Sequence, residues 1–323
     1  MIEISAAAHL FGWQISMSYL PFWTRRRFLA GSAVAAAVAA GDPLAFAQKH
    51  QPPRSAASSP EEIAGKVRGL MKGQTARPMR YRPGNGGFHV QNGSEFFNRP
   101  LYGPNNAFRV DAGDLPEFSL YLPGHGGNLR LGIASEGTSK WLHEAHKIDA
   151  VYRAGRMFYE VWDPLLQQGV LRIEIMTQAE GSGLYVCVEA TELPAGIRLL
   201  WAFGGVSGRK GKRGGDIGCE VEPVSLFFQL RPEECKGNVY TLHENTASLH
   251  SKAADMTFHF PLTSTLGLGD ATRWNAGWEA LSCQPAAEIA LPILIGSVEI
   301  ATGIPLSIVL QRETESQPPL NKP

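Results

Sequence analysis

The sequence predicts an all-β fold, a large antiparallel β-sandwich made of two sheets. The chain has 35 Gly and 22 Pro among its 323 residues, roughly 18% against an ordinary 12% or so, which favours many tight turns over long helices. From Tyr81 onward, short apolar segments alternate with clusters of Gly, Pro, Asn and Asp, a pattern typical of antiparallel strands. We count about fifteen such segments, too many for one open sheet, so two sheets packed face to face are the simplest solution.

Residues 1–47 have the pattern of an export signal. Thr-Arg-Arg-Arg-Phe-Leu at residues 24–29 fits the twin-arginine pattern, with Arg25 and Arg26 as the pair, and a cleavage site of small residues closes the segment. The apolar run at residues 30–40 is about a dozen residues long, whereas a membrane-spanning helix needs about 20. We therefore expect an exported protein, periplasmic or extracellular, with no membrane span after signal removal. A retained anchor is the alternative.

Three segments make up the rest of the chain. Residues 48–79 are predicted as a Pro- and Ser-containing linker followed by one amphipathic helix, which begins near Ser59 and ends at Gly73. Residues 80–312 hold the predicted sandwich as one domain. Residues 313–323 are polar and Pro-rich and are predicted as a tail.

The strands are predicted from the alternation of apolar and polar residues, because successive side chains of a strand point to opposite faces. The clearest runs are residues 117–122, 128–133, 156–162, 170–175, 184–190 and 198–203. Residues 289–295 and 304–310 are almost wholly apolar, which predicts strands covered on both faces. Each of these two runs contains Pro, which favours strand ends, edges or bulges.

Charge and motif patterns exclude several classes of function. Thirty basic and thirty acidic side chains leave no formal net charge, so nucleic acid is not an expected partner. The Gly-rich basic loop at residues 204–215 lacks the Ser or Thr of a phosphate-binding P-loop, and we predict a solvated hairpin loop. His143 and His146 lack the order of a zinc motif and are predicted to lie in an exposed turn. We therefore predict no metal and no cofactor.

The densest polar stretch of the sequence provides candidate site residues. Asp114 and Glu117 are candidates for an acid and base acting on a sugar, and His125 stands between glycines where it can reach a ligand. Aromatic rings stack on the apolar faces of sugars, and arginine and amide side chains bind sugar oxygens. The candidate ligand-binding residues are Arg99, Arg109, Asn128, Arg130, Trp274 and Trp278. The alternative is structural: turn formation and ion pairing for the polar residues, and core packing for the two Trp.

Six motifs between residues 80 and 130 carry a family resemblance. They are Arg80-Tyr-Arg-Pro83, Val90-Gln-Asn-Gly93, Phe97-Asn-Arg-Pro-Leu-Tyr-Gly103, Phe108-Arg-Val110, Ala112-Gly-Asp-Leu-Pro-Glu117 and Gly126-Gly-Asn-Leu-Arg130. With further segments up to residue 311, the chain resembles bacterial proteins that contain domain of unknown function 4450. The resemblance implies an exported, glycoside-hydrolase-like protein in which a β-supersandwich precedes a helical (α/α) toroid. It also implies that the catalytic machinery, which such architectures take mainly from the toroid, is missing from this chain.

These observations lead to three functional hypotheses. The first is an exported β-supersandwich that contacts carbohydrate or acts as a scaffold, inactive alone and with a missing C-terminal helical domain as a partner. The second is a complete small carbohydrate-active enzyme with its site at the rim of the sandwich. The third is a non-catalytic carbohydrate-binding module, with Trp274 and Trp278 as the platform.

Overall fold

The structure is a computed structural model that describes residues 80–84, 86–103, 107–211, 224–283 and 289–313. All of them belong to one compact unit, Met79–Pro323, and a separate unit covers Met1–Pro78. The predicted export signal, linker and amphipathic helix lie outside the described residues, as does the tail beyond residue 313.

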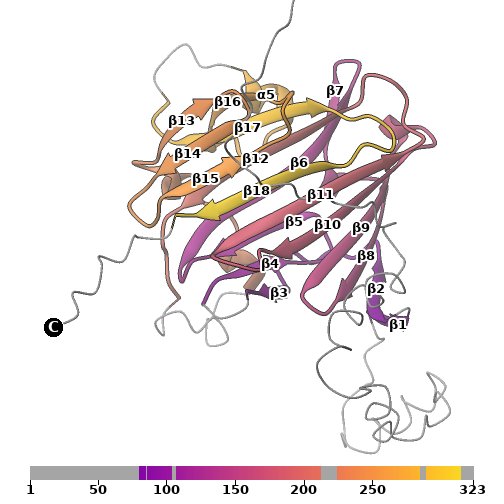
Figure 1. Cartoon of the computed structure of the whole chain (residues 1–323), viewed down its shortest axis with the longest axis horizontal. Helices are drawn as coiled ribbons and strands as arrows, with labels where there is room; N and C mark the ends of the chain where they lie inside the picture. Colours follow the sequence, from indigo (N-terminus) through magenta and orange to yellow (C-terminus); the bar gives the residue numbers. More distant parts are fainter. Residues whose placement is uncertain (1–79, 85, 104–106, 212–223, 284–288, 314–323) are drawn as a thin grey trace, which may run out of the picture. The chain divides into compact units, whose positions relative to one another are not determined.

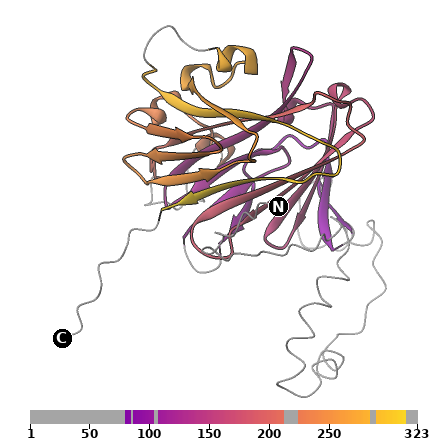
Figure 2. The ribbon, with the colours of Figure 1, turned by 45° about the horizontal axis from the view of Figure 1, so that its top comes forward.

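The described residues form two antiparallel sheets (Figure 1). The larger sheet has ten strands, in spatial order β1 (Arg82–Gly84), β2 (Gly87–Gln91), β8 (Lys147–Arg153), β9 (Arg156–Trp162), β10 (Val170–Thr177), β11 (Gly183–Thr191), β18 (Leu306–Arg312), β15 (Met256–His259), β14 (Thr246–His250) and β13 (Val239–His243). Figure 2 shows β13, β14 and β15 in orange beside β18 in yellow, although about 50 residues separate β18 from β15 in the chain.

The smaller sheet has eight strands, and one of them lies off its main path. In spatial order they are β16 (Thr265–Asp270), β17 (Pro292–Glu299), β12 (Arg198–Val206), β6 (His125–Ser135), β5 (Glu117–Tyr121), β4 (Arg109–Ala112) and β3 (Arg99–Tyr102), while β7 (Thr138–Trp141) pairs with β6. The all-β class and the two-sheet antiparallel sandwich are thus confirmed. The described residues contain 18 strands, more than the fifteen or so expected from turn spacing, because several, such as β1 and β7, are only three or four residues long.

Helical structure in the described residues is short. The α-helices are α4 (Val224–Phe227) and α5 (Trp278–Ser282), and the 3-10 turns are η1 (Leu142–Glu144), η2 (Pro164–Leu166), η4 (Pro232–Cys235) and η5 (Ala271–Arg273). Across this part of the chain, none of the helices has the length and apolar character needed to cross a bilayer.

The main core lies between the two sheets and follows from strand alternation. In β10, Leu171, Ile173 and Ile175 are fully buried while their neighbours are half-exposed, as predicted. The central strand β12 contributes Trp201, whose ring stacks on Phe260 with centroids 4.9 Å apart. Burying such side chains stabilises the fold by roughly 25 cal/mol per Å² of apolar surface.

The outer face of the eight-stranded sheet is covered as well. In β12, Trp201 and Phe203 belong to the main core, but Ala202 between them belongs to a second cluster. In β17, Leu294 faces the main core and Ile293 and Ile295 face the second cluster. Trp274, Leu281 and Cys235 come from the segments that cover this face. Double coverage explains the unbroken apolar run predicted at residues 289–295.

Two prolines lie at strand ends, as the sequence predicted. Pro292 is the first residue of β17, and Pro305 comes directly before β18. The strands therefore begin three and two residues later than the apolar runs at 289–295 and 304–310. Proline has no N–H to donate, so the ladder loses least when the proline stands at the start.

Candidate functional site

The predicted polar residues on β5 and β6 lie on the covered outer face of the eight-stranded sheet. Glu117 and Arg130 are direct partners in the register of β5 and β6. Arg130 Nε donates to Glu117 Oε2 at 2.8 Å, and Arg130 Nη1 donates to the carbonyl oxygen of Trp274 at 2.6 Å. The guanidinium lies 4.5 Å from the centroid of the Trp274 ring. The structure thus joins three predicted residues, and all three are more than nine-tenths buried.

A second polar cluster forms around His125. Its Nε2 lies 2.8 Å from Asn128 Oδ1, and Asn128 Nδ2 donates to the Phe228 carbonyl oxygen at 2.9 Å. Because the amide of Asn128 is oriented by that second bond, His125 Nε2 is the donor to Oδ1. Gly127 has φ +98°, and a Cβ there would lie 2.7 Å from the Gly204 oxygen, so glycine allows β6 to approach β12 at this point.

Glu234, in η4, completes the cluster from the covering segment. Its Oε2 lies 3.2 Å from His125 Nδ1, and its Oε1 accepts from Arg209 Nε. Burial alone would raise the pKa of Glu234, but His125, Arg209 and the backbone N–H of Arg231 outweigh burial and lower it to about 2. The predicted solvated loop is therefore wrong at Arg209, which also donates to the Phe227 carbonyl oxygen. Residues 212–215 of that loop lie outside the described part.

Arg109 and Asp111, in β4, form an ion pair on the same face. Arg109 Nε lies 3.0 Å from Asp111 Oδ2, and the guanidinium lies 4.2 Å from the Tyr121 ring centroid. Burial raises the pKa of Asp111 to about 6, although the charge of Arg109 opposes this. Arg109 was predicted to contact a ligand. In the structure its guanidinium is paired with the buried carboxylate of Asp111.

The two predicted catalytic carboxylates take different partners. Asp114 accepts from Arg80, from the Tyr81 hydroxyl and, at 3.1 Å, from the backbone N–H of Glu95. Its side chain is fully buried, and that of Glu117 is 3% exposed. A general acid must come within hydrogen-bond reach of its substrate. In this conformation neither carboxylate faces space that a sugar can enter.

The two predicted histidines of the 141–146 turn differ in exposure. His146 is exposed, as expected, but His143 is only 17% exposed, and that part of the prediction is wrong. The His143 ring packs edge-on against Phe96, and its Nδ1 lies 3.7 Å from Glu117 Oε2. Burial, with a smaller contribution from the charge of Arg130, lowers the pKa of His143 to about 4. Glu117 does not offset this effect, because its carboxylate is already paired with Arg130.

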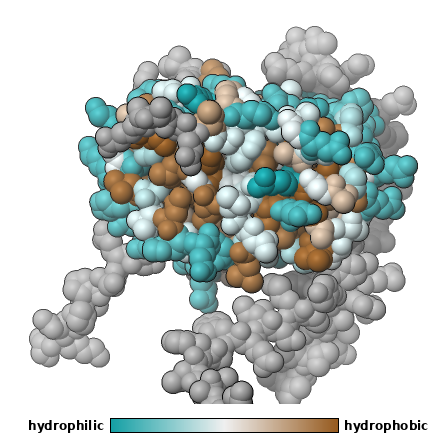
Figure 3. Space-filling model, turned by 90° about the horizontal axis from the view of Figure 1, so that it is seen from above, coloured by the Kyte–Doolittle hydropathy of each residue, from teal (hydrophilic) through white to brown (hydrophobic). Residues whose placement is uncertain are grey.

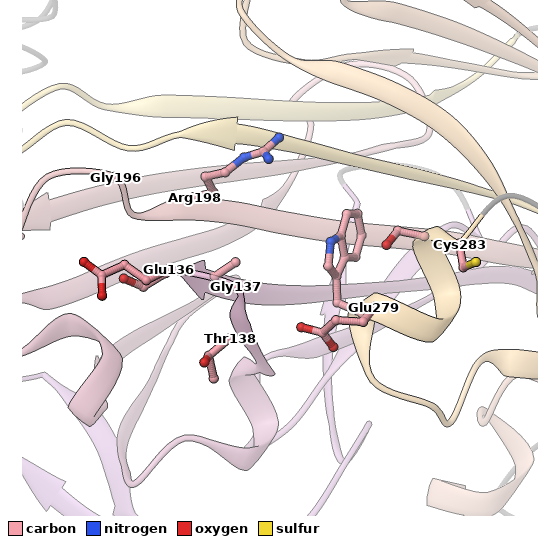
Figure 4. Close-up of a pocket in the computed structure, with 11 residues that line it drawn as sticks. Glu136, Gly137, Thr138, Gly196, Arg198, Glu279 and Cys283 are labelled. Atoms are coloured by element: carbon pink, nitrogen blue, oxygen red, sulfur yellow. The ribbon is translucent and has the colours of Figure 1, made fainter.

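Trp278 lines an open pocket of about 500 Å³, whereas Trp274 does not. The pocket is formed by the β6–β7 turn, the start of β12 and α5, and its polar lining includes Glu136, Arg198 and Glu279 (Figure 4). Trp274 is only 3% exposed beneath the covering segment. The predicted Trp pair is therefore divided between a pocket wall and a core position.

Two contacts made by Trp141 position α5 and the residues before it at this pocket. Trp141, the last residue of β7, donates from Nε1 to the Ala276 carbonyl oxygen at 2.9 Å. Its ring meets Trp278 edge to face, with centroids 6.2 Å apart. Sequence reasoning missed Glu136, Arg198 and Glu279, because three distant parts of the chain bring them together. Only the Glu-Gly turn at residues 136–137 was readable as a local signal.

Arg99 and four aromatic residues line a second pocket, of about 540 Å³. The two pockets share no lining residue. Figure 3 looks down on the edge of the molecule that carries β7 and α5 at the top of Figure 1, and hydrophobic patches alternate there with hydrophilic ones. Neither hydrophilic nor hydrophobic surface dominates that face.

The comparisons with known proteins support the family resemblance. The family model described as domain of unknown function (DUF4450) matches residues 122–319, which include the motif at Gly126–Arg130 and follow the other five. No curated protein matches the sequence. Among solved structures, the chain is similar to a bacterial glucoamylase complexed with acarbose, at 9% identity and a TM-score of 0.44, over 69% of this chain and 34% of that one. This chain thus spans about a third of that glucoamylase's length. Because the family model matches more than half of its residues, the chain belongs to the family of domain of unknown function 4450.

Proposed function

We propose that this protein is an exported β-sandwich that contacts carbohydrate at the Trp278 pocket and does not cleave it alone. The observation that carries this proposal is the composition of the pocket wall: one large aromatic ring with Arg198 and two carboxylates around it. A sugar ring has an apolar C–H face and a rim of hydroxyl groups. The aromatic ring matches the face, and charged side chains match the rim.

The buried state of the other candidates favours contact over catalysis. Asp114 and Glu117 are enclosed and ion-paired, and His125 is fully buried between Asn128 and Glu234. Breaking such pairs to admit a substrate would leave uncompensated charges in the interior. In this proposal these residues hold the covering segments on the sheet, and the sandwich serves as a scaffold for the helical part that the family resemblance implies.

Calorimetric titration of the full chain with a panel of neutral plant and bacterial oligosaccharides tests the contact site. We expect binding to at least one of them, lost in Trp278→Ala and weakened several-fold in Trp278→Phe, which keeps a ring in place. Leu262→Ala is the matched control, because Leu262 is 87% exposed and does not line the pocket. Absence of binding to every glycan, or equal binding by Trp278→Ala, would overturn the contact site.

Activity and export have separate tests. Release of reducing sugar by the purified chain would overturn the non-catalytic part, and loss of that release in Glu279→Gln would locate the acid in the pocket.

For export, Arg25→Lys combined with Arg26→Lys is expected to retain the protein in the cytoplasm, because the pathway recognises the arginine pair. Unchanged export of the double variant would argue against this route.

A further inference from the structure

The second pocket is lined by aromatic rings, two of which are exposed to solvent. Phe88 lies in β2, Tyr102 in β3 and Tyr152 in β8, and Tyr81 comes directly before β1. Phe88 and Tyr152 are direct partners in the register of β2 and β8. Phe88 is 51% exposed and Tyr102 is 65% exposed. Two large exposed rings in one pocket form an apolar surface of the kind found in ligand-binding grooves.

The two arginines of this pocket differ in their partners. The Arg99 guanidinium lies 4.0 Å from the centroid of the Tyr81 ring, and its Nη1 donates to the Asn98 carbonyl oxygen at 3.1 Å. Within the described ranges, no carboxylate pairs with Arg99. Arg80 differs, because it is paired with both Glu95 and Asp114. Arg99 therefore supplies the uncompensated positive charge of the pocket.

A rigid wall completes the site. Tyr81 is held by its hydroxyl bond to the buried Asp114 carboxylate, which fixes the ring beneath Arg99. The cation is thus presented on a prepared surface.

We propose that this pocket binds a uronic acid residue of an acidic oligosaccharide. The carboxylate pairs with the Arg99 guanidinium, whose planar fork matches two oxygens. The apolar face of the sugar ring lies against Tyr102 or Phe88, the two exposed rings of the pocket. An acidic peptide offers the carboxylate but no rigid C–H face for the exposed rings. This site shares no residue with the Trp278 pocket, so the two proposals can be tested independently.

The test is calorimetric titration of the full chain with oligomers of galacturonate, glucuronate and mannuronate. Each is compared with its methyl ester, which removes the charge and keeps the ring, and with oligoglutamate, which keeps the charge and removes the ring. We expect at least one uronate to bind about tenfold more tightly than its ester and than oligoglutamate, as for a charge-assisted bidentate contact. Absence of binding by all uronates, or equal binding of acid and ester or of uronate and oligoglutamate, would overturn the proposal.

Variants place the ligand in the pocket. We expect Arg99→Gln to weaken uronate binding about tenfold and Tyr102→Ala to weaken it several-fold. Arg82→Gln is the matched control, since Arg82 is exposed on β1 and does not line the pocket. Trp278→Ala leaves uronate binding unchanged, so failure of one site is distinguishable from failure of the other. Equal effects of Arg99→Gln and Arg82→Gln would show non-specific attraction and refute the site.

Discussion

Arg130 and Glu117 form a buried ion pair across β5 and β6, with Nε and Oε2 2.8 Å apart. The same guanidinium reaches the Trp274 carbonyl oxygen in the covering segment, so one side chain joins the sheet to the layer above it. Desolvation of two charges costs free energy that their attraction only partly returns. The pair therefore contributes more to fixing the position of the covering segment than to net stability.

Glu117→Gln is expected to destabilise the protein by about 3 kcal/mol, because Arg130 is left buried without a compensating charge. Urea unfolding at neutral pH measures the loss. The double variant Glu117→Gln, Arg130→Met removes both charges and is expected to be more stable than Glu117→Gln alone. A cost below about 0.5 kcal/mol for the single variant would show that Arg130 finds water or another partner.

Gly296 in β17 leaves room for the Trp201 ring, and a side chain at this position is expected to lower the stability of the protein. A Cβ on Gly296 would lie 2.4 Å from Trp201 Cζ2, so the indole must move within the main core. Gly296→Ala is expected to cost about 1–3 kcal/mol by overpacking, measured by thermal or urea unfolding. Gly267→Ala in β16 is the control, because its nearest atom would be 3.7 Å away. Equal stability of the two variants would contradict this account.

Much of the fold was predictable because strand alternation is a local signal. The run at residues 170–175 alternates in sequence, and the structure buries the predicted side. Short strands such as β3 were not predicted. Four residues that begin Arg-Pro carry little alternation, and β3 exists because β4 pairs with it. Pairing between segments is a tertiary property that propensity does not contain.

The candidate site was predictable only in part. Trp278 was predicted as a sugar contact and lines a pocket. Trp274, four residues earlier, is buried because Arg130 lies on its ring. No local pattern distinguishes the two tryptophans, since the difference comes from β6, more than 140 residues earlier in the chain. The environment of Arg209 was missed for the same reason, because its partner Glu234 comes from a different segment.

Glu234 is expected to make stability fall in acid. Its pKa is about 2 in the folded state against 4.5 ordinarily, so its contribution is complete above about pH 4.5 and is lost as the pH falls to about 2. By linkage the full change is roughly 3 kcal/mol. Urea unfolding of wild type and Glu234→Gln across this window checks it: the stability gap is expected to narrow as the pH falls. A gap that stays constant would show that the carboxylate titrates normally.

His143 is expected to change the stability of the protein in a higher pH window than Glu234. Its folded pKa of about 4 lies below the ordinary 6.5, so the unfolded chain takes up the proton first as the pH falls, and stability decreases between about pH 6.5 and 4. The largest loss of unfolding free energy from this titration is roughly 3 kcal/mol. Asp111, with its pKa raised to about 6, changes stability in the opposite direction over much of this range. The contribution of His143 is therefore masked by that of Asp111 when the wild-type profile is measured alone.

Comparison with His143→Gln isolates the histidine, because the contribution of Asp111 is common to both proteins and cancels. We expect wild type to lose stability relative to the variant as the pH falls through this window, measured by urea unfolding at several pH values. His146→Gln is the matched control: His146 is exposed, so its removal is expected to leave the profile unchanged. If both variants follow the wild-type profile, folding does not lower the pKa of His143. A gain of wild-type stability relative to His143→Gln as the pH falls would instead show that its 3.7 Å contact with Glu117 is an ion pair.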